Sequence, residues 1–358
     1  LNCVIFFILY FKYKKIFFGI KFGNMNKRFT IGKFPRTRLR RNRQSPWCRN
    51  LISETELSVN DLIYPMFVTN GKKITENIKS LPSVKRYSID IILKKIEEVK
   101  KLGIPAIALF PYVEKKLKTF DGKEALNKNN LICKAIKEIK KKFPDLGLIC
   151  DVALDPYTTH GHDGILRNNC IVNDETIEIL SQQAIIQAEA GADIIAPSDM
   201  MDGRIGVIRD RLDNEGFGNT IILSYAAKFA SNFYGPFRDA VGSSKSLGKT
   251  DKKTYQMNFQ NSNEAIREVS MDINEGADMV MIKPALPYLD IISKVKRKFN
   301  IPIFAYQVSG EYSMLKHAEK ENSLNYKKCL YESLISIKRA GASAIFCYGA
   351  IDIAKNLK

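Results

Sequence analysis

The stretch DETIEILSQQAIIQAEAGADIIAPS (174–198) contains the unit that decides the fold. From Asp174 to Ala190, apolar residues recur at three- and four-residue spacing with charges between them, which predicts an amphipathic helix. Gly191 follows at the position where helices commonly end on glycine. The next residues, Ala192–Ser198, form a short apolar run without polar alternation, typical of a strand that is buried on both faces of a parallel sheet.

The same unit recurs along the chain after Asp61. Helix-like segments end in Lys101-Leu-Gly103, Asn274-Glu-Gly276 and Arg339-Ala-Gly341, as the first does in Glu189-Ala-Gly191. Eight strand–helix units predict a TIM (β/α)8 barrel over residues 61–358, with its active site at the carboxyl ends of the strands. A doubly wound open sheet is the alternative, and it is weakened because no Gly-rich phosphate loop follows the first strand. The eight apolar runs are Ile63–Val68, Ala106–Phe110, Gly147–Leu154, Ala192–Ser198, Thr220–Ala227, Met279–Ala285, Pro302–Ser309 and Ala344–Ala350.

Charge is distributed unevenly over the 358 residues. The chain has 56 Lys and Arg against 38 Asp and Glu, a net charge of +18, but residues 1–53 hold 13 of the basic residues and no acidic one. The remainder is nearly balanced, with 43 basic against 38 acidic residues. A nucleic-acid-binding domain usually carries a basic surface on its folded body, so this distribution predicts no nucleic-acid partner.

The N-terminal segment has the composition of a targeting leader. The nine apolar residues Cys3–Phe11 are too few to span a membrane, and a basic, acid-free stretch follows them. This order resembles the bipartite leader of proteins sent to a secondary plastid. We therefore interpret residues 1–33 as a leader outside the fold and expect a non-photosynthetic, apicoplast-like plastid location without a membrane anchor in the mature form; a cytoplasmic location is the alternative.

Two lysines end neighbouring strands of the predicted barrel. Lys228 closes the fifth apolar run and Lys283 lies near the end of the sixth. Burial and mutual repulsion both disfavour the charged form of an amine, so at least one of the two is expected to be neutral near pH 7. A neutral amine is the nucleophile that forms a Schiff base with a ketone. Each lysine alone could also be a solvated residue at the rim of the barrel.

Five segments around these lysines resemble the 5-aminolevulinate dehydratase (porphobilinogen synthase) family, with the family's spacing from about Pro35 to the C-terminus. The resemblance implies an extended N-terminal arm, here residues 34–60, on a barrel that assembles as a homo-octamer. It also implies a lyase of heme and tetrapyrrole biosynthesis that condenses two 5-aminolevulinate molecules into porphobilinogen with loss of two waters. The segments are DVALDPYTTHGHDG (151–164), APSDMMDGR (196–204), SYAAKFASNFYGPFRDA (224–240), MVMIKPALPYLDI (279–291) and QVSGEYSML (307–315).

The resemblance also implies roles for individual residues. Lys283 would form the Schiff base with the first substrate and Lys228 with the second. Residues 235–256, a flexible basic loop by composition, would close as a lid that excludes water. The other implied catalytic residues, which orient substrate or move protons, are Asp151, Asp155, Asp163 and Ser198. The implied substrate-binding residues are Arg238, Lys252 and Gln256 for the second carboxylate, Ser309 and Tyr348 for the first, and Phe237 and Tyr234.

Metal use is predicted from three positions of the first segment. Some relatives hold a catalytic zinc there with three cysteines, whereas this chain has Ala153, Asp155 and Asp163. An alanine and two carboxylates do not make a thiolate zinc site, so no catalytic zinc is expected. The resemblance implies an allosteric magnesium at Glu268 instead, held by one carboxylate through a largely hydrated ion.

Two other functions are compatible with parts of the sequence. A class I aldolase acting on a phosphorylated sugar would use one lysine and a phosphate-binding loop after the seventh or eighth strand, and it leaves the second lysine unexplained. A basic binding protein, for example for RNA, would rest on the charge of residues 1–53 and leave the cluster of site residues unexplained.

Overall fold

Eight parallel strands close into a barrel in the computed structural model, which describes residues 32–243, 247 and 251–357. Each strand pairs with its neighbours along the chain, and β12 returns to β1 with Ile345 opposite Leu62, which closes the cylinder. The predicted TIM barrel is therefore confirmed. The strands are β1 (Leu62–Val68), β4 (Ala106–Pro111), β5 (Gly147–Val152), β8 (Ile194–Pro197), β9 (Ile221–Lys228), β10 (Met279–Lys283), β11 (Ile303–Gln307) and β12 (Ala344–Cys347).

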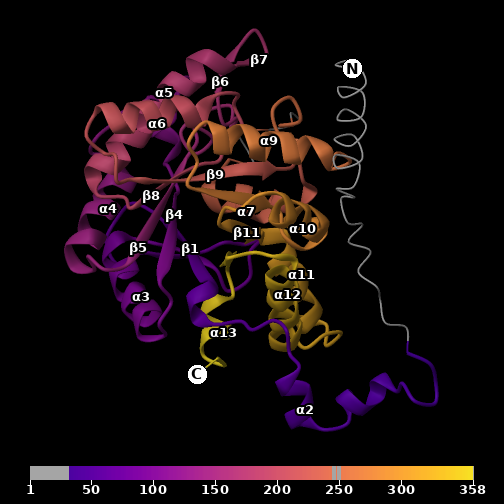
Figure 1. Cartoon of the computed structure of the whole chain (residues 1–358). Helices are drawn as coiled ribbons and strands as arrows, with labels where there is room; N and C mark the ends of the chain where they lie inside the picture. The colour runs from indigo at the N-terminus through magenta and orange to yellow at the C-terminus, as the bar shows by residue number, and fades with distance from the viewer. Residues whose placement is uncertain (1–31, 244–246, 248–250, 358) are drawn as a thin grey trace, which may run out of the picture. The chain divides into compact units, whose positions relative to one another are not determined.

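Helices follow the barrel strands in sequence and pack on the outside of the cylinder (Figure 1). Glycines with positive φ stand at the predicted helix ends, for example Gly191 at +109° after α5 and Gly341 at +122° after α12, a conformation that other residues rarely adopt. The helices of the barrel are α3 (Ile89–Lys101), α4 (Leu131–Lys142), α5 (Asn173–Ala190), α6 (Arg204–Asn214), α9 (Asn263–Asn274), α10 (Leu289–Lys298), α12 (Tyr326–Ala340) and α13 (Ala350–Ala354).

Further elements lie in the connections at the carboxyl ends of the strands. Two hairpins, β2 (Thr75–Asn77) with β3 (Lys85–Tyr87) and β6 (Ile165–Arg167) with β7 (Cys170–Val172), follow β1 and β5. Short helices and 3-10 turns occupy the remaining connections. These are η3 (Lys115–Leu117), η4 (Lys123–Leu126), η5 (Asn232–Tyr234), α7 (Gly235–Val241), η6 (Leu286–Tyr288) and the longer α11 (Ser309–Lys320). The 3-10 turn η2 (Val59–Asp61) instead directly precedes β1.

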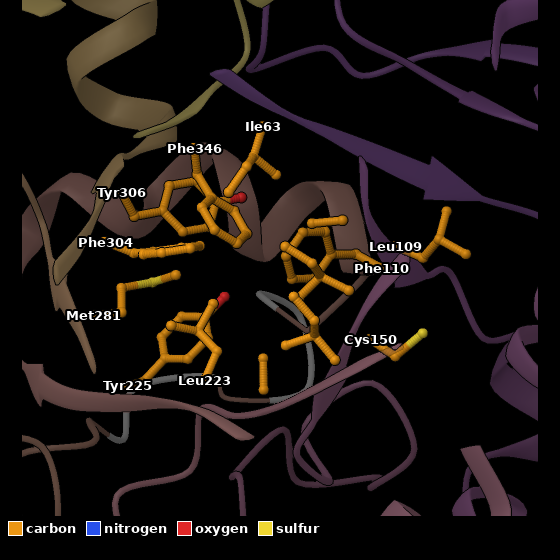
Figure 2. Packing of buried hydrophobic residues seen from close by; sticks show 14 of the residues in the cluster. Ile63, Leu109, Phe110, Cys150, Leu223, Tyr225, Met281, Phe304, Tyr306 and Phe346 are labelled. Carbon is orange, nitrogen blue, oxygen red and sulfur yellow. The ribbon is translucent and has the colours of Figure 1, made fainter. Parts of the chain in front are cut away.

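The barrel interior is filled by large apolar side chains. Figure 2 shows Tyr225, Met281, Tyr306 and Phe346 from β9 to β12 gathered in one packed region. The rings of Tyr306 and Phe346 have centroids 4.9 Å apart, and both side chains are fully buried. Because this interior is solid, small molecules can reach only the ends of the strands.

The chain divides into two compact units between Glu54 and Thr55. The first contains η1 (Leu39–Arg43) and α2 (Pro46–Leu51), and the second contains the barrel. Residues 1–31 of the predicted leader lie outside the described residues.

Candidate active site

Lys228 and Lys283 are paired across two neighbouring strands. They are the last residues of β9 and β10, and the parallel register places Lys283 directly opposite Lys228. Adjacent strands lie about 4.8 Å apart, so the two side chains begin next to each other. Each lysine is only 5% exposed, which brings two amines into one desolvated space.

Aromatic rings surround the Lys283 amine. Its Nζ lies 4.5 Å from the ring centroid of Tyr306, 4.8 Å from Phe237, 5.0 Å from Tyr225 and 5.4 Å from Tyr234. Burial lowers the pKa of this amine to about 7, and the Lys228 ammonium lowers it as well, against the opposing carboxylates of Asp151, Asp155 and Asp163. A large share of Lys283 is therefore neutral at physiological pH, which is the form that attacks a carbonyl carbon.

The Lys228 amine is held at the end of the neighbouring strand β8. Its Nζ donates a hydrogen bond to the backbone carbonyl of Ser198. The Ser198 hydroxyl donates a hydrogen bond to the carboxylate of Asp151 on β5. Burial and the Asp155 charge raise the pKa of Asp151 to about 7, against Ser198, Lys283 and Lys228. Because Asp151 and Lys283 titrate in the same range, a proton can pass between carboxyl and amine groups of this site at little cost.

A third buried lysine joins the two remaining carboxylates. Lys252 Nζ lies 3.0 Å from Asp163 Oδ1 and 3.4 Å from Asp155 Oδ2, and all three side chains are buried. Burial alone would raise the pKa of Asp163, but Lys228 and Lys252 outweigh it and lower the pKa to about 2. Burial raises the pKa of Asp155, opposed by Lys252. Asp163 is therefore ionised near pH 7.

Eleven of the predicted site residues line one cavity, which encloses about 360 Å³ including its open mouth. Within it, Asp151 Oδ1, Asp163 Oδ2 and Gln256 Oε1 are buried acceptors without a hydrogen-bond partner in the described part of the chain. Such acceptors suit a ligand that carries amine or hydroxyl donors. The lining residues are Asp151, Asp155, Asp163, Ser198, Lys228, Tyr234, Phe237, Arg238, Lys252, Gln256 and Lys283.

Ser309 and Tyr348, the other two predicted substrate-binding residues, lie beside this lining rather than in it. The Ser309 hydroxyl accepts a hydrogen bond from the Phe237 N–H at 2.9 Å and donates to the Phe233 carbonyl. The Tyr348 hydroxyl is 3.0 Å from that of Tyr306, whose ring contacts Lys283. Both residues therefore adjoin the Lys283 side of the cavity.

The two ends of the segment 235–256 are built into the structure, although the composition of the segment favours a flexible loop. It begins with α7, and it ends with Lys252 and Gln256 buried in the cavity wall. Arg86 donates to the carbonyls of Asp239 and Ala240, and Lys118 donates to that of Gly242, so two cations hold the C-terminal end of α7. Residues 244–246 and 248–250 lie outside the described residues.

The two histidines of the first segment are engaged within the protein. His160 Nε2 lies 3.0 Å from the Phe120 carbonyl, and His162 Nδ1 lies 3.1 Å from the Tyr255 hydroxyl. Burial lowers the pKa of both rings. The contact from His162 supports the position of Tyr255, whose hydroxyl also accepts a hydrogen bond from the Asp163 N–H.

Glu268 lies on α9 and lines a separate cavity, which also contains Glu264 and Asp202. Burial raises the pKa of Glu268, and the charges of Asp272, Asp202 and Glu264 raise it further, against the buried cation of Arg204. Among the described residues, no group of three or more His, Cys, Asp or Glu is arranged to enclose a metal ion. The excess of carboxylates nevertheless suits a hydrated cation held through one or two ligands.

Sequence reasoning missed the two tyrosines that contact the Lys283 amine, Tyr225 and Tyr306. Both belong to apolar runs whose pattern predicts strands and indicates no role in the site. The one feature of the sequence that could have placed them in the site is their position, because each lies within three residues of the carboxyl end of its strand.

The fold and the cavity define a class of protein: a (β/α)8-barrel enzyme with two buried lysines at the strand ends, suited to amine chemistry on a carbonyl substrate. Comparison with known proteins makes the class specific. The family model for delta-aminolevulinic acid dehydratase matches residues 36–356, and the chain belongs to this family.

Individual relatives agree over most of their length. The delta-aminolevulinic acid dehydratase of Bradyrhizobium diazoefficiens is 52% identical over 321 residues, which cover 90% of this chain and 91% of the relative. The chloroplastic enzyme of Glycine max is 46% identical over 89% of this chain and 77% of its own. The crystal structure of the enzyme from Toxoplasma gondii ME49, in complex with the reaction product porphobilinogen, has 47% identity and a TM-score of 0.87, covering 89% and 91% of the two chains. The aldolase and RNA-binding alternatives are left without support.

Replacing Lys252 with methionine tests the buried charge cluster. Lys252→Met leaves Asp155 and Asp163 without their shared cation, so the free energy of unfolding at pH 7 is expected to fall by about 3–5 kcal/mol in urea titrations followed by circular dichroism. Lys253→Met is the matched control, because Lys253 pairs with Asp251 at the surface, is 69% exposed, and its loss should cost less than about 1 kcal/mol.

The same comparison has a defined pH dependence. Acid protonates the carboxylates, which removes the unpaired charge, so the difference between the two variants should shrink as the pH is lowered toward 4. Equal small losses for both variants at pH 7 would contradict the assignment of Lys252 as the cation of this cluster.

Proposed function

We propose that the chain condenses two molecules of 5-aminolevulinate into porphobilinogen, with loss of two waters, through Schiff bases on Lys283 and Lys228. As a member of its family the chain is a lyase of porphyrin biosynthesis. The observation that carries the assignment of residues is the register pair of buried lysines, one with a pKa near 7, in a chain whose relative from Toxoplasma gondii binds porphobilinogen.

Lys283 is the first nucleophile in this proposal. Its neutral amine attacks the ketone carbon of the first substrate to give a carbinolamine. The acid form of Asp151, whose pKa is raised to about 7, supplies the proton with which the carbinolamine hydroxyl leaves as water, and the iminium remains. Four aromatic rings exclude water from the iminium that forms and stabilise its delocalised positive charge. They belong to Tyr306, Tyr225, Phe237 and Tyr234. Lys228, 5% exposed beside it, has the matching role for the second substrate.

The carboxylates handle protons and the substrate amine. An iminium makes the adjacent carbon acidic, and Asp151, with its pKa raised to about 7, suits removal of that proton and its return to a departing group. Asp163 and Asp155 line the cavity beside Lys252, and Asp163 Oδ2 is a buried acceptor without a hydrogen-bond partner among the described residues. That acceptor fits the ammonium group of a 5-aminolevulinate molecule. Ser198 lines the same cavity and is hydrogen-bonded to Asp151.

Cations and hydroxyls on the other sides of the cavity suit the substrate carboxylates. Arg238 and Gln256 line the same cavity as Lys228 and would hold the second carboxylate, together with Lys252. Ser309 and Tyr348 adjoin Lys283 and would hold the first, after their present hydrogen bonds to Phe233 and Tyr306 rearrange. Phe237 and Tyr234 would pack against the first substrate's carbon chain.

Reductive trapping tests the proposal. Wild-type protein incubated with 5-aminolevulinate and borohydride should gain the mass of one reduced substrate on Lys283 in peptide mass spectrometry. Lys283→Met should lower pyrrole formation by at least about 10³-fold because the nucleophile is lost. Lys294→Met, a partly buried lysine of α10 outside the cavity, is the control and should keep normal turnover. A wild-type enzyme that forms porphobilinogen without any adduct at Lys283 would refute the assignment.

Magnesium is proposed as an activator that binds away from the catalytic cavity. The support is the resemblance together with the position of Glu268 in a cavity that also contains Glu264 and Asp202. Burial raises the pKa of Glu268, and the charges of Asp272, Asp202 and Glu264 raise it further. Glu268, with water molecules and the neighbouring carboxylates, would hold the ion and offset that charge. No catalytic zinc is proposed, because Asp155 and Asp163 bind Lys252 and position 153 is alanine.

Metal dependence can be measured in the same assay of pyrrole formation from 5-aminolevulinate. We expect magnesium to raise turnover of the wild type severalfold and Glu268→Gln to remove this response. Glu319→Gln is the control, which should keep the response, because Glu319 is an exposed member of a surface ion pair on α11. Phenanthroline, a zinc chelator, should leave turnover largely unchanged. Inhibition that only zinc reverses would contradict the proposal.

Assembly and location are proposed on separate grounds. A homo-octamer built through the arm is supported by the exposed apolar side chains of Phe34, Trp47 and Leu51 in the first unit. Import into a plastid is supported by the acid-free leader and by the chloroplastic relative from Glycine max. In the described ranges 32–243, 247 and 251–357, no helix combines the length and hydropathy needed to cross a membrane.

A further inference from the structure

Glu311 is a buried carboxylate to which the proposed reaction gives no role. It is the third residue of α11, only 1% exposed, and its carboxylate accepts three backbone hydrogen bonds. Oε1 accepts from the Leu286 N–H at 2.6 Å, while Oε2 accepts from the Val308 N–H at 2.6 Å and from the Ala285 N–H at 3.4 Å. One side chain therefore connects the loop that follows β10 to the loop that follows β11.

The first of these loops carries Lys283. Ala285 and Leu286 are the second and third residues after the lysine, so Glu311 holds the chain immediately beyond it. On the other side, the Lys283 carbonyl accepts from the Phe229 N–H and from the Tyr234 hydroxyl, each at 3.0 Å. The backbone of Lys283 is thus fixed from β9 and η5 on one side and from α11 on the other.

The second loop carries Ser309, two residues before Glu311. The Ser309 hydroxyl accepts from the Phe237 N–H, and Gly310 lies so close to η5 that an added Cβ would stand 2.5 Å from the Phe233 carbonyl oxygen. The three consecutive residues Ser309, Gly310 and Glu311 therefore contact α7, η5 and the loop after Lys283, respectively. Loss of the third contact would free the lysine's loop from the other two.

A carboxylate suits this position better than an uncharged amide. Both of its oxygens accept hydrogen bonds, and the amino end of α11 favours negative charge. Burial raises the pKa of Glu311 to about 7, while the three N–H donors oppose the shift. Among the described residues, the Glu311 charge raises the pKa of Tyr234, Tyr288 and Cys347. Burial raises the pKa of each of these three groups as well, so all three are uncharged near pH 7 and none of them supplies a charge in place of that of Glu311.

We propose that Glu311 is a positioning residue for the reaction: its carboxylate ties the Lys283 loop to the Ser309 loop and so sets the Lys283 amine at the distance needed to attack a substrate held beside Ser309. The proposal rests on the proposed role of Lys283. It predicts that substitution of Glu311 slows formation of the Lys283 Schiff base in protein that is fully folded.

Two variants of Glu311 and one control test this role. Glu311→Gln keeps one acceptor oxygen but places an NH₂ group against backbone N–H donors, and Glu311→Asp keeps the charge but shortens the reach. Glu319→Gln makes the same chemical change at an exposed position of α11. For each protein we would measure kcat, KM and the rate at which borohydride traps the 5-aminolevulinate adduct on Lys283. The kcat and the trapping rate are divided by the concentration of folded protein, which circular dichroism measures.

The expected result is a fall in kcat and in trapping rate of about 10- to 100-fold for Glu311→Gln, a smaller fall for Glu311→Asp, and wild-type values for Glu319→Gln. If Glu311→Gln does not fold, Glu311→Asp decides, since aspartate is well tolerated in the first turn of a helix. Trapping rates within about twofold of wild type in the folded variants would overturn the proposal. Failure of the wild type to form any Lys283 adduct would instead refute the role of Lys283 itself.

Discussion

The burial of two lysine amines side by side at the carboxyl ends of β9 and β10 is the constraint on which the site depends. Two ammonium groups at strand spacing repel each other strongly when water is excluded. The protein relieves this repulsion by lowering the pKa of Lys283 to about 7, which leaves a large share of that amine neutral, and by facing both amines with Asp151, Asp155 and Asp163. The same charge balance makes Lys283 a nucleophile and keeps Asp163 ionised. Reactivity and stability of the barrel mouth thus have one electrostatic origin.

Rigid supports hold these groups in place. The barrel fixes the lysines through strand register, Lys252 joins the carboxylates from across the cavity, and Arg86 holds the end of α7. Glu311 adds a bridge between the loops of Lys283 and Ser309. Each support comes from a different strand–helix connection, which is how a (β/α)8 barrel builds a site at one end of its strands.

The barrel could be predicted from the sequence because its signals are local. Each apolar run of branched residues became a barrel strand within a few residues of its expected ends, and glycines such as Gly191 mark the helix ends in both sequence and structure. The pairing of Lys228 with Lys283 then follows from strand order. The cluster of Lys252 with Asp155 and Asp163 could not be predicted in this way, since it joins residues 97 and 89 positions apart through a segment whose composition favours a flexible loop. The bridge at Glu311 was equally hidden, because its partners are backbone amides, which no residue pattern reveals.

The most direct test of the account is the pKa of the Lys283 amine in the substrate-free enzyme. It can be measured by competitive acetylation at a series of pH values, with the extent of labelling at each lysine read by peptide mass spectrometry. The account predicts a midpoint near pH 7 for Lys283, with the reactive neutral amine accumulating as the pH rises through that value. Ordinary exposed lysine side chains titrate near about 10, so Lys283 should be labelled at a markedly lower pH than they are. A midpoint near 10 for Lys283 as well would contradict the account, because the amine would then be protonated at the pH at which the enzyme is proposed to work.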